Sequence, residues 1–323
     1  MTGQDGQTGH RESTGHQRAP RLREAMGMVG RGAAMGAADV VPGVSGGTVA
    51  LLTGIYDRLI GILGDGARGL GRLVRGDLRG AVLQLRQLDW TFIIPLLVGL
   101  LGAVVLLAGV IEGALIDHPE PMAGLFLGLV AASVMVAQRK VAWTVGRLVV
   151  AGIVGLTLFV ALGWQGPPVT DPSALALFAS GAVAICAMVL PGISGSFLLL
   201  MLGMYTTVID IVDERMLADA AIFGAGAVVG LSCFSTVLSR LLDKRADDVL
   251  AVMVGLLLGS GRVLWPWPHG VGVVSRHAGD AVGGAGLGWP DTAGGLAVPA
   301  LLAGLAVVVV LGVERLARRW SNH

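Results

Sequence analysis

The chain is dominated by apolar segments that are long enough to cross a lipid bilayer. A helix needs about 20 mostly apolar residues to span the hydrocarbon core, and six stretches meet this length with few charges inside them. This pattern is typical of an all-α polytopic membrane protein. The six predicted crossings are residues 91–111, 121–138, 142–163, 219–240, 249–265 and 293–313.

Two further apolar segments, residues 32–64 and 174–209, are too long for a single crossing. Each is interrupted near its middle by a Pro-Gly-X-Ser-Gly element, which begins at Pro42 in the first segment and at Pro191 in the second. Proline removes a helical hydrogen bond and glycine tolerates positive φ, so we expect a helix to break at both places. Each segment is either a broken helix that crosses once or a hairpin that returns to its own side.

The distribution of arginine favours hairpins. Both flanks of the first long segment are basic, and basic loops remain in the cytoplasm, so its two ends lie on the same side. Six crossings and two hairpins then satisfy every loop, with both termini cytoplasmic. Residues 1–24 are polar and glycine-rich and are predicted to form a disordered tail. The flanking arginines are Arg18, Arg21, Arg23 and Arg31 before the segment and Arg68, Arg72, Arg75, Arg79 and Arg86 after it.

The two interrupted segments are copies of one another. Aligning Pro42 with Pro191 gives seven identities in the fifteen positions from 42 to 56. The chain has only two tyrosines, Tyr56 and Tyr205, and they occupy the same place in each copy. This match indicates an internal repeat.

The repeat continues, more weakly, into the crossings. Residues 124–128 (Gly-Leu-Phe-Leu-Gly) are similar to residues 255–259 (Gly-Leu-Leu-Leu-Gly). We therefore expect two repeats, residues 25–165 and 166–323, each a re-entrant helical hairpin followed by three transmembrane helices. Because three is odd, the second repeat is expected to be inverted relative to the first, an architecture common among secondary transporters.

Composition agrees with a membrane protein and excludes several other classes. Hydrophobic residues make up 54% of the chain and charged residues 14%, against roughly a quarter charged in soluble domains. A net charge of +1 gives no basic field for nucleic acid. Both cysteines, Cys186 and Cys233, lie in apolar runs, and none of the six histidines lies in a predicted crossing. We expect no disulfide, metal or cofactor.

Each Pro-Gly-X-Ser-Gly tip is suited to bind an anion. Its amide N–H groups open the second half-helix, where free donors and the positive end of the helix dipole attract negative charge. The alternative is tight packing, in which the serines satisfy the tips' own backbone; two matched tips favour a shared anion site. The candidate substrate-binding residues are Gly43, Ser45, Gly46, Gly47, Thr48, Gly192, Ser194, Gly195 and Ser196.

Three ionisable residues extend this candidate site. Asp39 lies inside an apolar stretch, and an intramembrane carboxylate is costly and usually functional, so it is the candidate for coupling to a proton or sodium gradient. Arg31 begins the first hairpin and Arg262 ends the fifth crossing, and both are candidates for binding the anion. The alternatives are snorkelling for Arg31 and interfacial anchoring for Arg262, which precedes two tryptophans.

Catalysis is not expected. Both tips spell Gly-X-Ser-Gly, which resembles the nucleophile motif of intramembrane rhomboid proteases, but that chemistry needs a base near the serine, and the predicted crossings contain no histidine. The predicted membrane segments also lack the clusters of His, Arg or acidic residues that a lipid phosphatase or a glycosyltransferase would need.

The motifs resemble those of the PopT family of polyprenyl-phosphate transporters. The resemblance spans roughly residues 24–316 and rests on residues 35–56, on the tip at 191–195 and on residues 255–267. It implies translocation of undecaprenyl phosphate, or a related polyprenyl phosphate, from the outer to the inner leaflet of the bacterial cytoplasmic membrane. The carrier lipid would then be reused in the synthesis of peptidoglycan and other cell-envelope polymers.

Two other classes stay open on the residues alone. An ion-coupled transporter or channel for a small soluble anion would use the same tips but would close its pore to lipid. A structural or assembly factor would tolerate replacement of both tip serines. The expected partners are a polyprenyl phosphate and the bilayer itself, and the pattern is also compatible with a homo-oligomer.

Overall fold

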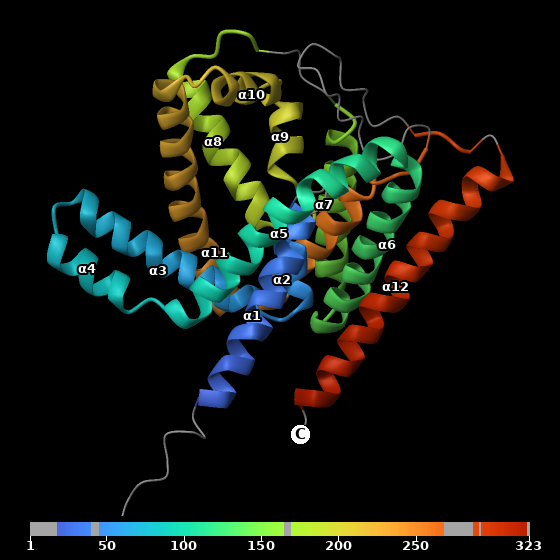
Figure 1. Ribbon diagram of the computed structural model, residues 1–323, viewed down its shortest axis with the longest axis horizontal. Helices are drawn as coiled ribbons and strands as arrows, with labels where there is room; N and C mark the ends of the chain where they lie inside the picture. Colours follow the sequence, from blue (N-terminus) through green and yellow to red (C-terminus); the bar gives the residue numbers. More distant parts are fainter. Residues whose placement is uncertain (1–17, 40–44, 165–168, 268–286, 291, 322–323) are drawn as a thin grey trace, which may run out of the picture.

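The computed structural model describes residues 18–39, 45–164, 169–267, 287–290 and 292–321 (Figure 1). Over these ranges the chain is helical and contains no strand, which confirms the all-α prediction. A single 3₁₀ turn, Gln138–Lys140, follows α6. The α-helices are α1 (Arg18–Asp39), α2 (Gly46–Leu52), α3 (Tyr56–Val74), α4 (Leu78–Arg86), α5 (Trp90–Asp117), α6 (Pro119–Ala137), α7 (Val145–Ala161), α8 (Ala174–Val189), α9 (Gly195–Met201), α10 (Tyr205–Asp213), α11 (Leu217–Ser260) and α12 (Ala293–Ser321).

Four of the described helices, α5, α6, α11 and α12, are long and apolar enough to cross a membrane. The predicted crossings 219–240 and 249–265 both fall largely in α11, whose 44 residues continue past a break at Arg245 (φ −144°, ψ 47°). The predicted crossing 142–163 is α7, which is apolar but has 17 residues. The chain is thus a helical membrane protein. Counting six crossings requires α11 to be taken as two helices and α7 as a short crossing.

Each interrupted segment folds into three helices with the same local geometry. The first gives α1, α2 and α3, and the second gives α8, α9 and α10. Both middle helices contain seven residues, and both are followed by a glycine with positive φ, 72° at Gly54 and 69° at Gly203. Such a residue ends a helix in a Schellman cap. The closing 6→1 hydrogen bonds run from Ile55 to the Ala50 carbonyl (3.0 Å) and from Met204 to the Leu199 carbonyl (2.8 Å).

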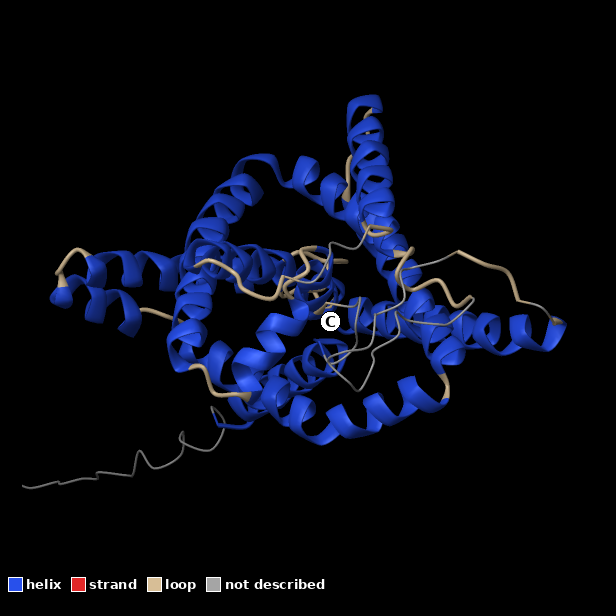
Figure 2. Cartoon of the chain, turned by 90° about the horizontal axis from the view of Figure 1, so that it is seen from above, coloured by secondary structure: helices blue, strands red, loops and turns tan. Residues whose placement is uncertain are grey.

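The helices extend beyond the predicted segments at two points. α1 begins at Arg18, so the end of the predicted 1–24 tail is helical, while residues 1–17 lie outside the described residues. α3 continues to Val74, past the predicted end of the hairpin at 64, and pairs with α4. Figures 1 and 2 show α3 and α4 projecting sideways from the helical bundle in both views. The second hairpin leads directly from α10 into α11.

Glycines set the closest helix contacts. α1 packs along α5 and α8 packs along α11. A Cβ at Gly32 would overlap the carbonyl oxygen of Leu96, and one at Gly181 would overlap that of Phe223. Gly32 and Gly181 each precede their tip proline by ten residues. Backbones can therefore approach closely at equivalent places in both halves, which is how membrane helices gain packing contacts.

The echo between residues 124–128 and 255–259 marks two further contacts of the same kind. Gly124 of α6 lies against Pro299 of α12, and Gly255 of α11 lies against Ala151 of α7, where an added Cβ would be 2.5 Å from the Ala151 carbonyl oxygen. In each case the glycine motif of one half receives the last helix of the other half. The two halves therefore form one interlocked bundle.

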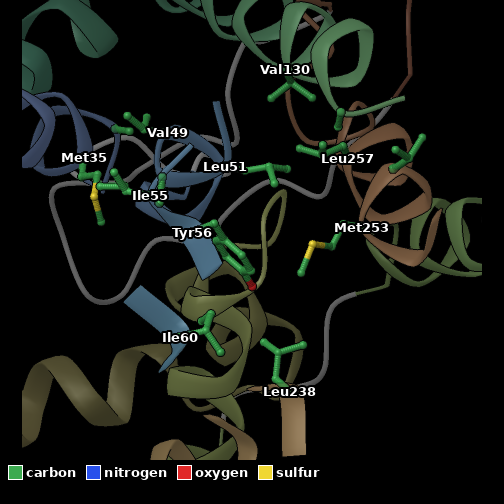
Figure 3. Close-up of a cluster of buried hydrophobic side chains, with 14 of the residues drawn as sticks. Met35, Val49, Leu51, Ile55, Tyr56, Ile60, Val130, Leu238, Met253 and Leu257 are labelled. Carbon is green, nitrogen blue, oxygen red and sulfur yellow. The ribbon is translucent and has the colours of Figure 1, made fainter. Parts of the chain in front are cut away.

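The largest buried apolar cluster lies where the first hairpin meets α6 and α11. Figure 3 shows Tyr56 among its side chains, with Ile60 and Leu238 on one side and Met253 and Leu257 on another. Tyr56 is 2% exposed, and Ile60 is fully buried. This cluster holds the end of α2 and the start of α3 firmly in the centre of the bundle.

Candidate functional site

The two hairpin tips lie in direct contact. Ser45 caps α2: its Oγ accepts a hydrogen bond from the amide of Gly47 at 3.1 Å and donates one to the Met188 carbonyl at 2.8 Å. Thr48 Oγ1 accepts a hydrogen bond from the amide of Gly192 at 3.1 Å. Both side chains are almost completely buried. Their hydroxyl groups therefore hold the second hairpin against the first.

Tyr56 completes this contact. Its hydroxyl donates to the carbonyl oxygen of Val189 at 3.1 Å. The same carbonyl limits the space at Gly47, where an added Cβ would lie 2.7 Å from it. Gly192, at φ 89°, adopts a conformation that suits glycine. These contacts are the ones that the packing interpretation expects of Ser45, Gly47, Thr48 and Gly192.

Asp39, at the end of α1, already occupies part of the N-terminus of α2. Its Oδ1 accepts a hydrogen bond from the amide of Gly46 at 2.5 Å, and its carboxylate fills the space where a Cβ of Gly46 would stand. Carboxylates are favourable at this end of a helix because of the free amides and the helix dipole. A protein carboxylate therefore stands where the sequence predicted that an anionic ligand would bind.

A cavity of about 330 Å³ opens beside the tips. Its polar lining comes from Asp39, Ser45, Ser194 and Tyr205, and the backbone of Gly195 is also exposed to it. These groups come from both hairpins. The rest of the lining is apolar or glycine and belongs to α8, the second tip, α9, α10 and α11: Gly181, Ala184, Ile185, Met188, Ile193, Leu199, Val208, Ile209, Phe223 and Ala227.

Some of the predicted site residues lie at the cavity, and others lie in the contact between the tips. Asp39, Ser45, Ser194 and Gly195 line the cavity, and Gly46 binds the Asp39 carboxylate. Two predicted residues cannot be placed, because Gly43 and the side chain of Ser196 lie outside the described residues. Sequence reasoning did not assign Tyr205 to the site, although the matched positions of the two tyrosines were a usable signal.

The two arginines proposed for the site lie elsewhere. Arg31 is a half-buried residue of α1 whose Nη1 is 3.8 Å from Met28 Sδ, and it does not line the cavity. Arg262 follows α11, with its guanidinium 5.1 Å from the centre of the Phe159 ring of α7. Its Nε is buried and has no hydrogen-bond partner among the described residues. Gly163 leaves the space that the guanidinium fills.

Sequence comparisons relate the chain to known proteins. The family model described as undecaprenyl phosphate translocase-like matches residues 35–282. A polyprenyl-phosphate transporter of Vibrio cholerae serotype O1 is 39% identical over 245 residues, which cover 73% of this chain and 76% of that protein. A polyprenyl-phosphate transporter of Staphylococcus aureus is 30% identical over 254 residues, which cover 73% of this chain and 84% of that protein. No solved structure matches.

Proposed function

Since the chain belongs to the undecaprenyl phosphate translocase-like family, we propose that it moves undecaprenyl phosphate, or a related polyprenyl phosphate, across the bacterial cytoplasmic membrane. Transport runs from the outer to the inner leaflet and returns the carrier lipid for the synthesis of peptidoglycan and other envelope polymers. The single observation that carries this proposal is the cavity beside the tips, whose lining combines a few polar residues with a majority of apolar ones.

The lining of the cavity fits an amphiphile better than a small anion. A phosphate monoester needs several hydrogen-bond donors, and the lining of the cavity includes Ser194, Tyr205 and the backbone of Gly195. A free anion such as sulfate gains nothing from the apolar side chains of Ile185, Met188 and Phe223, whereas isoprenoid units pack against them. A lipid substrate also agrees with the two relatives, which are both polyprenyl-phosphate transporters.

Alternating access follows from the proposed topology. Two inverted halves, with cytoplasmic termini, place one hairpin on each side of the membrane. The last helix of each half packs on the other half, α12 on α6 and α7 on α11. This exchange supports a pseudo-symmetric arrangement. Rocking of one half against the other then exposes the cavity to each leaflet in turn, while the isoprenoid chain remains in lipid.

Asp39 gives this cycle a means of coupling. In the structure its carboxylate holds the Gly46 amide and faces the same cavity as Ser194 and Tyr205. A phosphate that enters the cavity meets this negative charge, and two anions at about 4 Å repel strongly in a medium of low dielectric. Binding a proton or a cation at Asp39 removes the repulsion and frees the amide. The lipid and the coupling ion therefore enter together.

Arg262 supplies a first contact on the outer side. Its guanidinium lies over the Phe159 ring, and its Nε has no partner among the described residues, so it retains hydrogen-bonding capacity for a phosphate. Replacing Arg262 with Gln should raise the lipid concentration needed for half-maximal transport several-fold with little change in maximal rate. Gly163→Ala, which displaces the guanidinium, should have the same effect. A loss of maximal rate without this shift would contradict the assignment.

The proposal is tested with purified protein in liposomes that contain a fluorescent polyprenyl phosphate and a quencher confined to one side. Wild-type protein should expose inner-leaflet lipid to the quencher, and Tyr205→Phe or Ser194→Ala should slow this exchange at least tenfold. Thr53→Val is the matched control, because the Thr53 hydroxyl bonds within its own helix. Uptake of inorganic phosphate or sulfate without lipid exchange would establish the soluble-anion alternative, and full activity of the Ser45→Ala/Ser194→Ala double variant would overturn the site.

A further inference from the structure

The α3–α4 projection, residues 65–86, has no counterpart after α10 in the part of the chain that the structure describes, because α10 leads directly into α11. It extends sideways from the bundle in both views (Figures 1 and 2). It contains five arginines against two aspartates, Asp65 and Asp77, and no other charged residue. Its role is not explained by the cavity, which it does not line.

The projection is internally packed. α4 turns its small buried residues, Gly80 and Ala81, toward α3. Arg72 Nη1 donates to the Gly80 carbonyl at 3.3 Å, and Gln84 Nε2 donates to Asp65 Oδ1 at 3.4 Å. These contacts fix the rotation of α4 about its own axis, so the face it presents outward is defined.

Both α3 and α4 are attached to the start of α5. The Arg58 guanidinium bonds Asp89 and lies 4.5 Å from the centre of the Phe92 ring. Trp90 Nε1 donates to the Leu85 carbonyl at 2.9 Å. α3 also packs on α11. The outward face of α4 is therefore held at a fixed place beside the bundle.

That outward face is apolar and bordered by arginine. Leu78, Val82 and Leu85 are spaced i, i+4 and i+7, so they share one side of α4 and are 63%, 48% and 41% exposed. Arg79 and Arg86, seven residues apart, form the adjoining exposed stripe. A soluble helix would not turn three large aliphatic side chains to water. This combination is typical of helices that lie in a membrane interface.

We propose that the α3–α4 projection is a binding surface for anionic phospholipid in the cytoplasmic leaflet. Leu78, Val82 and Leu85 enter the boundary of the acyl chains, and Arg75, Arg79 and Arg86 contact phosphate headgroups. The two aspartates do not oppose this, because Asp65 pairs with Arg68 and Asp77 caps α4 through the Gly80 amide at 2.8 Å. The partner is thus identified by charge complementarity and by the apolar stripe. This inference does not rest on the proposed function.

The test uses the full-length protein in liposomes, with a fluorophore on Val82→Cys in a Cys186→Ser/Cys233→Ser background. Nitroxide-labelled phosphatidylglycerol and phosphatidylcholine are compared as quenchers. A label on Leu217→Cys, at an exposed position after the acidic end of α10, is the matched control. An arginine at an anionic surface contributes about 1 kcal/mol, so the Val82 label should favour phosphatidylglycerol about fivefold. The Leu217 label should show no preference.

The Arg75→Gln/Arg79→Gln/Arg86→Gln variant separates charge from burial. It should lose the preference for phosphatidylglycerol while the neutral lipid still quenches the Val82 label. Quenching of that label by aqueous iodide rather than by either lipid would show that the face lies in water and would overturn the proposal. Shielding from both lipids and iodide would assign the face to a second copy of the chain instead, and equal quenching by the two lipids would reject the anionic partner.

Discussion

The contact between the hairpin tips can be tested at Thr48. This side chain is fully buried, and its Oγ1 is the acceptor for the Gly192 amide at 3.1 Å. Thr48→Val keeps the shape of the side chain and removes the acceptor. The Gly192 amide then points at a methyl group in a site closed to water, because the positive φ of Gly192 fixes its direction.

Two magnitudes bear on the cost of this change. Leaving a buried donor unsatisfied costs about 1–3 kcal/mol, whereas side-chain hydrogen bonds between membrane helices average about 0.6 and reach about 1.7 kcal/mol. The Gly192 amide has no second acceptor among the described residues, so the upper part of the membrane range applies. We expect Thr48→Val to lower the free energy of unfolding by about 1–2 kcal/mol.

Thr53→Val is the matched control for this measurement. The Thr53 hydroxyl donates to the Val49 carbonyl, which also accepts from the Thr53 amide, so its removal leaves no group unsatisfied. Unfolding free energies are measured in lipid–detergent micelles for both variants and for Thr48→Ser, which keeps the acceptor and should recover most of the loss. If Thr48→Val costs no more than Thr53→Val, the hydroxyl does not hold the tips together and the reasoning is wrong.

Two further predictions concern packing and pH. Gly124→Ala should destabilise the protein by roughly 1–3 kcal/mol because the new methyl overlaps the Pro299 carbonyl, whereas Gly152→Ala, with open space around it, should be neutral in the same unfolding assay. Hydrogen bonds from the Thr91 hydroxyl and the Arg58 guanidinium hold the pKa of Asp89 below its usual range. The stabilisation that the ionised Asp89 carboxylate gives to the contact with Arg58 should therefore be complete above about pH 5 and lost below about pH 4. The fluorescence of a label on α4 follows this change with pH. An unchanged profile in Asp89→Asn would contradict the prediction.

The sequence was sufficient for the pattern of breaks and for the repeat, because both depend on local chemistry. Proline and glycine interrupt the apolar segments near Pro42 and Pro191, and the structure ends α1 and α8 just before them. Positive φ at Gly54 and Gly203 likewise follows from residues that the alignment had already paired. The helix ends were less predictable, since α3 continues to Val74 through tertiary contacts with α4 and α11.

The division of labour within the site could not be predicted in this way. Ser45 and Ser194 are equivalent in sequence. Ser45 caps α2 and also bonds the Met188 carbonyl, and this second contact depends on how the other hairpin is placed. The partner of Asp39 in the repeat is Met188, so the two tips differ at a position that touches both the cavity and the contact. Tertiary placement, which no local pattern encodes, decides that Ser45 reaches the backbone of the opposite hairpin.

The most informative difference between the halves lies at positions that the repeat makes equivalent. Tyr56 and Ile60 are packed into the core, and the Tyr56 hydroxyl bonds the opposite tip. Their counterparts, Tyr205 and Ile209, line the cavity. Equivalent residues are therefore packed in the core in one half and line a cavity in the other. This difference agrees with the proposed alternating access, in which one side of the transporter is closed while the other is open.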